Sequence, residues 1–148
     1  MAFQFSNLKK NIKPYFIAEA GVNHECSLRA AKKLIDAAKD GGADAIKFQT
    51  YKAEKIASKN SPYYWDLKKE KTRSQFELFS KYDKFDEKHY RELHNYCKKR
   101  KIEFLSTPFD LESVNFLNPL LNVFKISSSD ITNFPLIEAI ASKKKPII

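Results

Sequence analysis

The feature that most constrains the fold is a regular alternation of short apolar runs with segments of helical periodicity. Four runs of strand type occur, and the last residues begin a fifth: 15–18, 45–49, 103–106, 123–126 and 146–148. Between them, apolar residues recur at spacings of three and four, most clearly in 28–38, 86–97 and 133–140. Because parallel strands need helical crossovers, this order predicts an α/β fold with a parallel sheet.

Two architectures have this order, an open doubly wound sheet and a (β/α)8 barrel, and secondary structure alone does not separate them. No GxGxxG motif follows the first run, which counts against a dinucleotide-binding sheet. The segment 50–73 is too long for a simple connector. With its aromatic residues it suits a flap over a substrate, plain packing or an oligomer contact, and we favour packing.

Composition excludes several protein classes. With 43% hydrophobic and 14% aromatic residues, the chain has the material for a packed core. No stretch approaches the ~18 apolar residues of a membrane span, and the opening residues lack the apolar run of a secretory signal, so we expect a cytoplasmic protein. Cys26 and Cys97 lie far apart without metal-ligand spacing, and we expect both to be reduced.

The net charge is +9, and basic residues cluster at 98–101 and 143–145. Each cluster ends a helical pattern, where cations complement the helix dipole. Neither cluster carries the interleaved aromatic residues of a single-strand nucleic-acid binder. We therefore favour solvated helix ends, with a small anionic substrate as an equally suitable partner. A basic nucleic-acid-binding or scaffold domain stays as the less favoured alternative.

Polar residues gather at the carboxyl ends of four successive predicted strands. They are Glu19, Asn23 and His24 at the first, Lys47 and Gln49 at the second, Ser106 and Thr107 at the third, and Lys125 with 127–130 at the fourth. In a parallel barrel these ends converge on one mouth. The sequence therefore predicts a binding site there.

Two lysines stand within apolar strands, Lys47 and Lys125. A buried ammonium group is costly without an anionic partner, and we expect this partner to be a ligand. The alternative is a pair of internal salt bridges, with Glu19 and Asp130. Two ammonium groups, a threonine hydroxyl and three serines suit a ligand that carries both a phosphate and a carboxylate, as phosphoenolpyruvate does. Glu19 beside lysines suits a proton acceptor.

At these residues the sequence resembles the N-acetylneuraminate (sialic acid) synthase family, including its legionaminic and pseudaminic acid synthases. The matching segments span nearly the whole chain: 16–24, 42–50, 104–109, 124–130, 133–137 and 145–148. The resemblance implies that residues 1–148 form the N-terminal half of a (β/α)8 TIM barrel, truncated at about strand five. The C-terminal half-barrel and the family's antifreeze-like domain would then be absent.

The resemblance also implies the reaction. A transferase of this family condenses phosphoenolpyruvate with an N-acetylmannosamine-like amino sugar to give a nonulosonic (sialic-type) acid and phosphate, as a homodimer. A divalent metal, manganese or magnesium, polarises the sugar aldehyde. The family's metal-binding histidines lie beyond strand five, so we expect no metal ligand in this chain. His89 and His94 should then have packing or surface roles. We also expect the fragment alone to be inactive. The alternative enzyme is another phosphoenolpyruvate-dependent aldolase with an aldose phosphate as acceptor.

By resemblance, each candidate residue has a role. Phosphoenolpyruvate would be bound by Lys47, Thr107, Lys125 and Ser128. The sugar would be bound by Gln49 and Asp130, and Glu19 would assist catalysis. Asn23 and His24 would shape the mouth of the barrel. Sialic acid synthases proper tend to carry glutamate in place of Asp130, and a small-Ser-Gly pattern in place of 127–129. A shorter carboxylate leaves more room, which favours a bulkier diacetamido acceptor of the legionaminic type.

Overall fold

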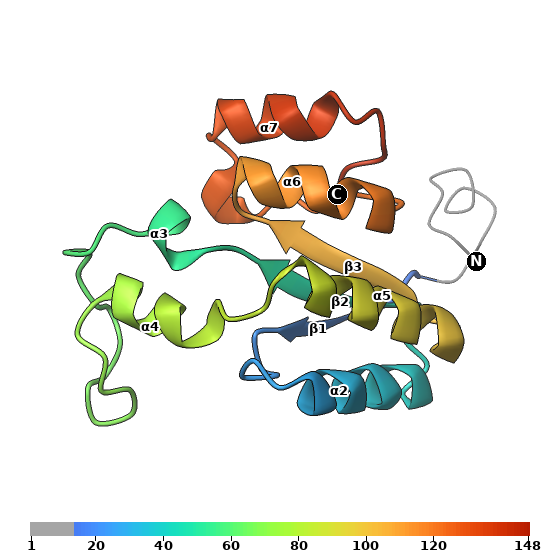
Figure 1. Ribbon diagram of the computed structural model, residues 1–148, viewed down its shortest axis with the longest axis horizontal. Helices are drawn as coiled ribbons and strands as arrows, with labels where there is room; N and C mark the ends of the chain where they lie inside the picture. The colour runs from blue at the N-terminus through green and yellow to red at the C-terminus, as the bar shows by residue number, and fades with distance from the viewer. Residues whose placement is uncertain (1–13) are drawn as a thin grey trace.

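The computed structural model describes residues 14–148, in which three parallel strands form one sheet. Strands β1 (Ile17–Gly21), β2 (Ala45–Thr50) and β3 (Glu103–Pro108) lie in the order β1-β2-β3. In Figure 1 their carboxyl ends point toward the side that carries α3 (Ala53–Ile56) and α4 (Gln75–Tyr82). The expectation that the opening residues lack a secretory signal concerns a segment outside the described residues.

Four further helices are α2 (Leu28–Asp40), α5 (Glu87–Arg100), α6 (Leu111–Leu117) and α7 (Phe134–Ala141) (Figure 1). The predicted caps set two of the starts. The Ser27 hydroxyl accepts from the Ala30 amide at 3.2 Å, and the Asp110 carboxylate accepts from the Ser113 amide at 2.8 Å. Within residues 14–148 no helix has the length and apolar character to cross a membrane.

The sheet separates two apolar clusters of unequal size. The larger fills the space between sheet and helices and includes Ile46, Phe48 and Leu93. The smaller lies on the opposite, inner face and contains Ala45, Leu105 and Val123. Because successive side chains of a strand point to opposite faces, neighbouring residues of β2 belong to different clusters. This alternation assigns each side chain at the strand ends to one face.

The prediction of a fourth strand is wrong, because residues 123–126 form only an isolated parallel bridge, between Phe124 and Ile147. The Phe124 amide donates to the Pro146 carbonyl at 2.9 Å, and the Ile148 amide donates to the Phe124 carbonyl at 2.9 Å. The Ile126 amide also donates to the Ile148 carbonyl at 2.9 Å, but Pro146 has no N–H to add to the pairing. The short run 146–148 therefore lies beside 123–126 as expected.

The long segment after β2 is folded on itself. Besides α3, it contains an antiparallel bridge between Pro62 and Ser74, which closes a loop over 62–74. The Trp65 indole donates to the Thr72 carbonyl at 3.0 Å, and the rings of Tyr63 and Tyr64 both contact Trp65. Tyr63 and Tyr64 are nevertheless 45% and 77% exposed, so the packing role favoured from the sequence stays a prediction.

Candidate active site

The inner face of the sheet carries charged and polar side chains where the strands approach their carboxyl ends. Glu19 of β1 stands opposite Lys47 of β2, and Gln49 stands opposite Thr107 of β3. Lys47 follows the inner-face residue Ala45 by two positions, so its side chain leaves the same face. Parallel register therefore brings these side chains from three strands together.

Lys47 has partners on both neighbouring strands. Its Nζ lies 2.5 Å from Glu19 Oε2 and 3.4 Å from Thr107 Oγ1. The Lys47 side chain is 13% exposed, whereas that of Glu19 is 49% exposed. The ammonium group is thus held in a largely dry position, while the carboxylate also reaches water. For Lys47 the internal salt bridge considered from the sequence is present.

Gly21 ends β1 between two of the candidate side chains. Its φ is +53°, a conformation that side-chain-bearing residues rarely adopt. A Cβ at this position would lie 3.4 Å from Glu19 Oε1 and 3.8 Å from Gln49 Nε2. The carboxylate of Glu19 and the amide of Gln49 thus flank Gly21.

Tyr90 is a positioning residue that the sequence did not indicate. Its hydroxyl donates to the Gln49 carbonyl at 2.9 Å, which anchors the end of β2 to α5. Burial raises the pKa of Tyr90 far above its ordinary value, so the phenol stays a donor. Tyr90 falls within the helical pattern of 86–97, and nothing in that pattern distinguishes it from a packing residue.

Lys125 lies on the inner face by the same alternation. Val123 belongs to the inner cluster, whereas Phe124 and Ile126 pack with the outer one. The Lys125 ammonium group donates to the Ile126 carbonyl at 2.5 Å. Within residues 14–148 no ion pair joins Lys125 to Asp130, so the internal salt bridge considered for this second lysine is not formed.

Ser128 and Asp130 belong to the short 3-10 helix η2 (Ser128–Asp130), which begins just after Lys125. Asn133 donates to Asp130 Oδ1 at 3.1 Å, so the carboxylate is tied to the start of α7. In the described part of the chain no hydrogen bond connects these residues with Lys47 or Glu19. The candidate residues thus form two groups, one on β1–β3 and one after Val123.

His24 is buried beneath the turn between β1 and α2, whereas Asn23 is exposed. The imidazole stacks on Phe85 with ring centroids 4.4 Å apart, and its Nδ1 accepts from the Cys26 amide at 3.1 Å. Burial lowers the pKa of His24 to about 4, so the ring is neutral at pH 7. His24 can therefore shape the mouth only through the turn that it supports.

The other histidines have local roles. His89 completes the cap of α5 with Asp86, and the ring of His94 meets Phe104 edge-on at 5.9 Å. Residues 14–148 contain no group of three or more histidine, cysteine, aspartate or glutamate side chains arranged to hold a metal ion.

The fold and the inner-face residues define a class: a partial parallel (β/α) barrel with its polar groups toward the carboxyl ends of the strands. The sequence profile of the NeuB family matches residues 34–148, so the chain belongs to this family of sialic, legionaminic and pseudaminic acid synthases. The resemblance seen in the sequence is thereby confirmed.

Individual relatives agree with this membership. The chain is 49% identical over 141 residues to the N,N'-diacetyllegionaminic acid synthase of Campylobacter jejuni, covering 92% of this chain and 41% of the relative. It is 42% identical over 154 residues to the enzyme of that name from Legionella pneumophila, covering 97% and 43%. The crystal structure of N-acetylneuraminic acid (sialic acid) synthetase from Leptospira borgpetersenii superposes with a TM-score of 0.76 at 35% identity, covering 91% and 44%. The chain spans about two fifths of the length of these relatives.

Proposed function

We propose that this chain supplies part of the active site of an enzyme that condenses phosphoenolpyruvate with an amino-sugar aldehyde to give a nonulosonic acid and phosphate. The observation that carries the proposal is the inner-face position of Lys47, held between Glu19 and Thr107. Membership of a family of synthases supports the enzymatic class. The complete protein is expected to add the remaining barrel and an antifreeze-like domain, and to work as a cytoplasmic homodimer.

The proposed roles follow from charge and hydrogen-bonding capacity. Lys47 and Lys125 neutralise the phosphate and carboxylate of phosphoenolpyruvate, and the hydroxyls of Thr107 and Ser128 donate to its oxygens. A ligand that recruits the Lys125 ammonium group replaces its contact with the Ile126 carbonyl.

On the sugar side, Gln49 and Asp130 bind hydroxyl or amide groups of the acceptor. Glu19, whose carboxylate reaches water, accepts a proton from a water or hydroxyl group. The metal of this family would be held by parts of the protein outside residues 14–148.

The proposed acceptor is a diacetamido sugar of the legionaminic type. Two relatives that match more than nine tenths of this chain are named N,N'-diacetyllegionaminic acid synthases. Asp130 agrees with this choice, because its short carboxylate leaves space beside the sugar for a second acetamido group.

Complementation tests the proposed function. The chain is co-expressed with the remaining C-terminal part of the Campylobacter jejuni relative, and phosphate release from phosphoenolpyruvate is measured with manganese. We expect release with the diacetamido sugar, weaker release with N-acetylmannosamine and none with an aldose phosphate. Lys47→Gln should reduce the rate at least about a hundredfold, whereas Lys33→Gln, on the exposed face of α2, should not change it.

Two outcomes contradict the proposal. A well-folded complex that stays silent with every amino sugar argues against the synthase activity. Release that requires an aldose phosphate favours the other class of phosphoenolpyruvate-dependent aldolase.

A further inference from the structure

The outer face of the sheet carries two buried hydroxyl groups directly behind the candidate active site. Thr50 is 3% exposed, Ser106 is 1% exposed, and their side-chain oxygens lie 2.6 Å apart. In the sequence, Ser106 is one of the polar residues that predict a binding site. Its side chain, however, leaves the same face as that of Phe104, two positions earlier, which belongs to the outer cluster. Ser106 therefore does not face the ligand side that carries Lys47.

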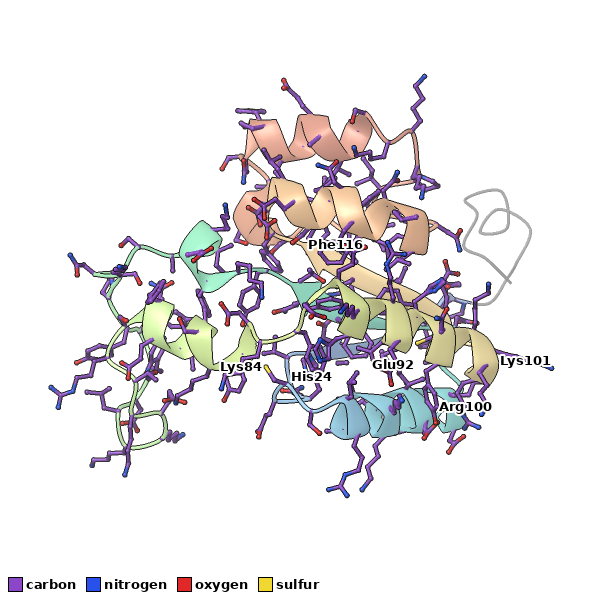
Figure 2. The ribbon with its side chains drawn as sticks, in the orientation of Figure 1. His24, Lys84, Glu92, Arg100, Lys101 and Phe116 are labelled. Carbon is purple, nitrogen blue, oxygen red and sulfur yellow. The ribbon has the colours of Figure 1, made fainter. Side chains whose placement is uncertain are left out.

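Aromatic side chains cover this hydroxyl pair. Tyr90 of α5 is 5% exposed, and its ring lies 5.8 Å from that of Phe116 of α6. Figure 2 shows Phe116 on the side of α6 that faces α5. Burial raises the pKa of Tyr90, and a hydrogen bond with the Thr50 side chain acts in the opposite direction. The Thr50 hydroxyl thus has two partners, Ser106 and Tyr90, in surroundings without water.

Each hydroxyl of the pair is next in sequence to a candidate residue of the inner face. Thr50 follows Gln49, and Ser106 precedes Thr107. In the ladder Thr50 stands opposite Pro108, two positions beyond Ser106. The hydroxyl bond therefore runs diagonally across the end of the ladder and resists sliding of one strand along the other. Holding the outer side chains holds the backbone from which the inner side chains project.

Stability alone does not require hydroxyl groups at these two positions. Removal of one partner of a buried hydrogen bond leaves the other unsatisfied, whereas replacement of both by apolar groups of similar shape can be nearly neutral. Valine in place of Thr50 and alanine in place of Ser106 would be such a replacement. What an apolar pair does not supply is a directional bond that fixes the two strand ends in one arrangement.

We propose that the hydroxyl pair of Thr50 and Ser106 is a positioning element of the phosphoenolpyruvate site. By fixing the ends of β2 and β3, the pair holds the Thr107 hydroxyl 3.4 Å from the Lys47 ammonium group, so that both groups meet the same ligand. This role rests on the proposed function, and neither hydroxyl of the pair touches the substrate.

Nuclear Overhauser effects between the Thr107 methyl group and the Lys47 ε-methylene protons test the proposal without substrate. In the 148-residue chain we expect them to be at least about twofold weaker in the double variant, Thr50→Val with Ser106→Ala, because a shift of about 0.5 Å suffices. The double variant leaves neither hydroxyl of the pair unpaired and should unfold at nearly the urea concentration of the parent chain. Thr50→Ser, which keeps the hydroxyl, should retain the Overhauser effects.

Kinetics of the complemented enzyme give the second measurement. With the C-terminal part of the Campylobacter jejuni relative, the double variant should raise KM for phosphoenolpyruvate at least about fivefold and change kcat less than about twofold. Ser113→Ala is the matched control. Ser113 is buried and lines the same cavity of about 190 Å³ as Thr50, but its hydroxyl donates to Asp110 and not to a strand. This control should change neither the Overhauser effects nor KM.

Several results overturn the proposal. Unchanged Overhauser effects in the double variant, or an unchanged KM in an active complex, would exclude a positioning role. Effects that appear in Thr50→Val and disappear in the double variant would leave a purely stabilising role, and equal effects of Ser113→Ala would mean a general response to a lost buried hydroxyl.

Failure of the proposed function is distinguishable from these results. If the parent complex releases no phosphate, the proposed function fails, and the Overhauser effects alone decide whether the pair positions Thr107. A dispersed NMR spectrum checks the fold of each variant. If the double variant does not fold, Ser106→Ala takes its place in both measurements, because it leaves Thr50 its partner Tyr90.

Discussion

At the scale of single residues, Lys47 and Glu19 form an ion pair whose members differ in their access to water. Glu19→Gln leaves a largely buried ammonium group without a countercharge, and we expect a loss of about 2 kcal/mol in the free energy of unfolding. Lys47→Met removes the buried charge and leaves a carboxylate that water can solvate, so its loss should stay below about 1 kcal/mol. Urea unfolding of both variants measures the difference.

The order of the two effects is the informative result. If Lys47→Met destabilises the chain more than Glu19→Gln, the packing of the lysine stem outweighs the desolvated charge. The double variant, Glu19→Gln with Lys47→Met, is the control, because it should be more stable than Glu19→Gln alone.

His24 makes stability depend on pH. Its pKa is lowered to about 4 in the folded chain, against an ordinary value near 6.5, so the unfolded chain binds the proton more readily. The contribution of the neutral ring is complete above about pH 6.5 and is lost as the pH falls toward 4. The loss is at most about 3 kcal/mol.

Unfolding measured at a series of pH values checks this prediction. His24→Phe keeps an aromatic ring against Phe85 but cannot titrate, so its stability should fall less between pH 7 and pH 4. Parallel pH profiles of the two proteins would contradict the assignment to His24.

At the scale of elements, α2 and α5 are joined along their exposed sides by polar contacts. Lys32 and Glu92 form an ion pair at 2.6 Å, and the Tyr96 hydroxyl donates to Asp36 at 3.0 Å. Arg100 forms ion pairs with Asp36 and Asp40. Exposed ion pairs contribute little to stability. The buried stripe of each helix therefore provides most of the packing energy between α2 and α5, and the polar contacts fix how the two helices align.

The start of α2 gives the prediction at this scale. Ser27→Ala removes the hydroxyl that accepts from the Ala30 amide, and we expect a loss of about 1 kcal/mol in the free energy of unfolding. Ser27→Asp retains an acceptor at the cap and should unfold at nearly the same urea concentration as the parent chain. Equal losses in both variants would show that the hydroxyl acts through another contact.

At the scale of the whole molecule, local pattern predicted the three paired strands and the main helices. Apolar runs and caps such as Ser27 and Asp110 depend on nearby residues, which a single sequence displays. The pairing of 123–126 depends on a partner distant in the chain, so its reduction to one bridge was not predicted. Burial of His24 was missed for the same reason, because Phe85, which covers it, lies in another loop.

The site was predicted in part. Polar residues at strand ends were visible in the sequence, and so was the choice between a ligand and Glu19 as the partner of Lys47. The contact of Tyr90 with the Gln49 carbonyl was not visible, because it depends on the depth at which α5 packs.

The arrangement of the sheet predicts how the chain behaves in solution. In the described part of the chain β1 has one paired neighbour, and open strand edges promote association. We expect the sedimentation coefficient of the isolated chain to rise with concentration. Addition of the C-terminal part of the Campylobacter jejuni relative should give one heterodimeric species. A monomer that sediments unchanged across a wide concentration range would contradict this expectation.

The aromatic stack at the start of α5 has a dynamic consequence. Phe85 lies between two imidazoles, with centroids 4.4 Å from His24 and 4.7 Å from His89. Since one ring comes from the β1–α2 turn and the other two from the α5 entrance, neither segment can open without separating the rings. The backbone amides of both segments should therefore exchange with deuterium in a single cooperative event. The C-terminal part of β1, which carries Glu19, should then be protected from exchange as strongly as the start of α5, although the two are distant in sequence.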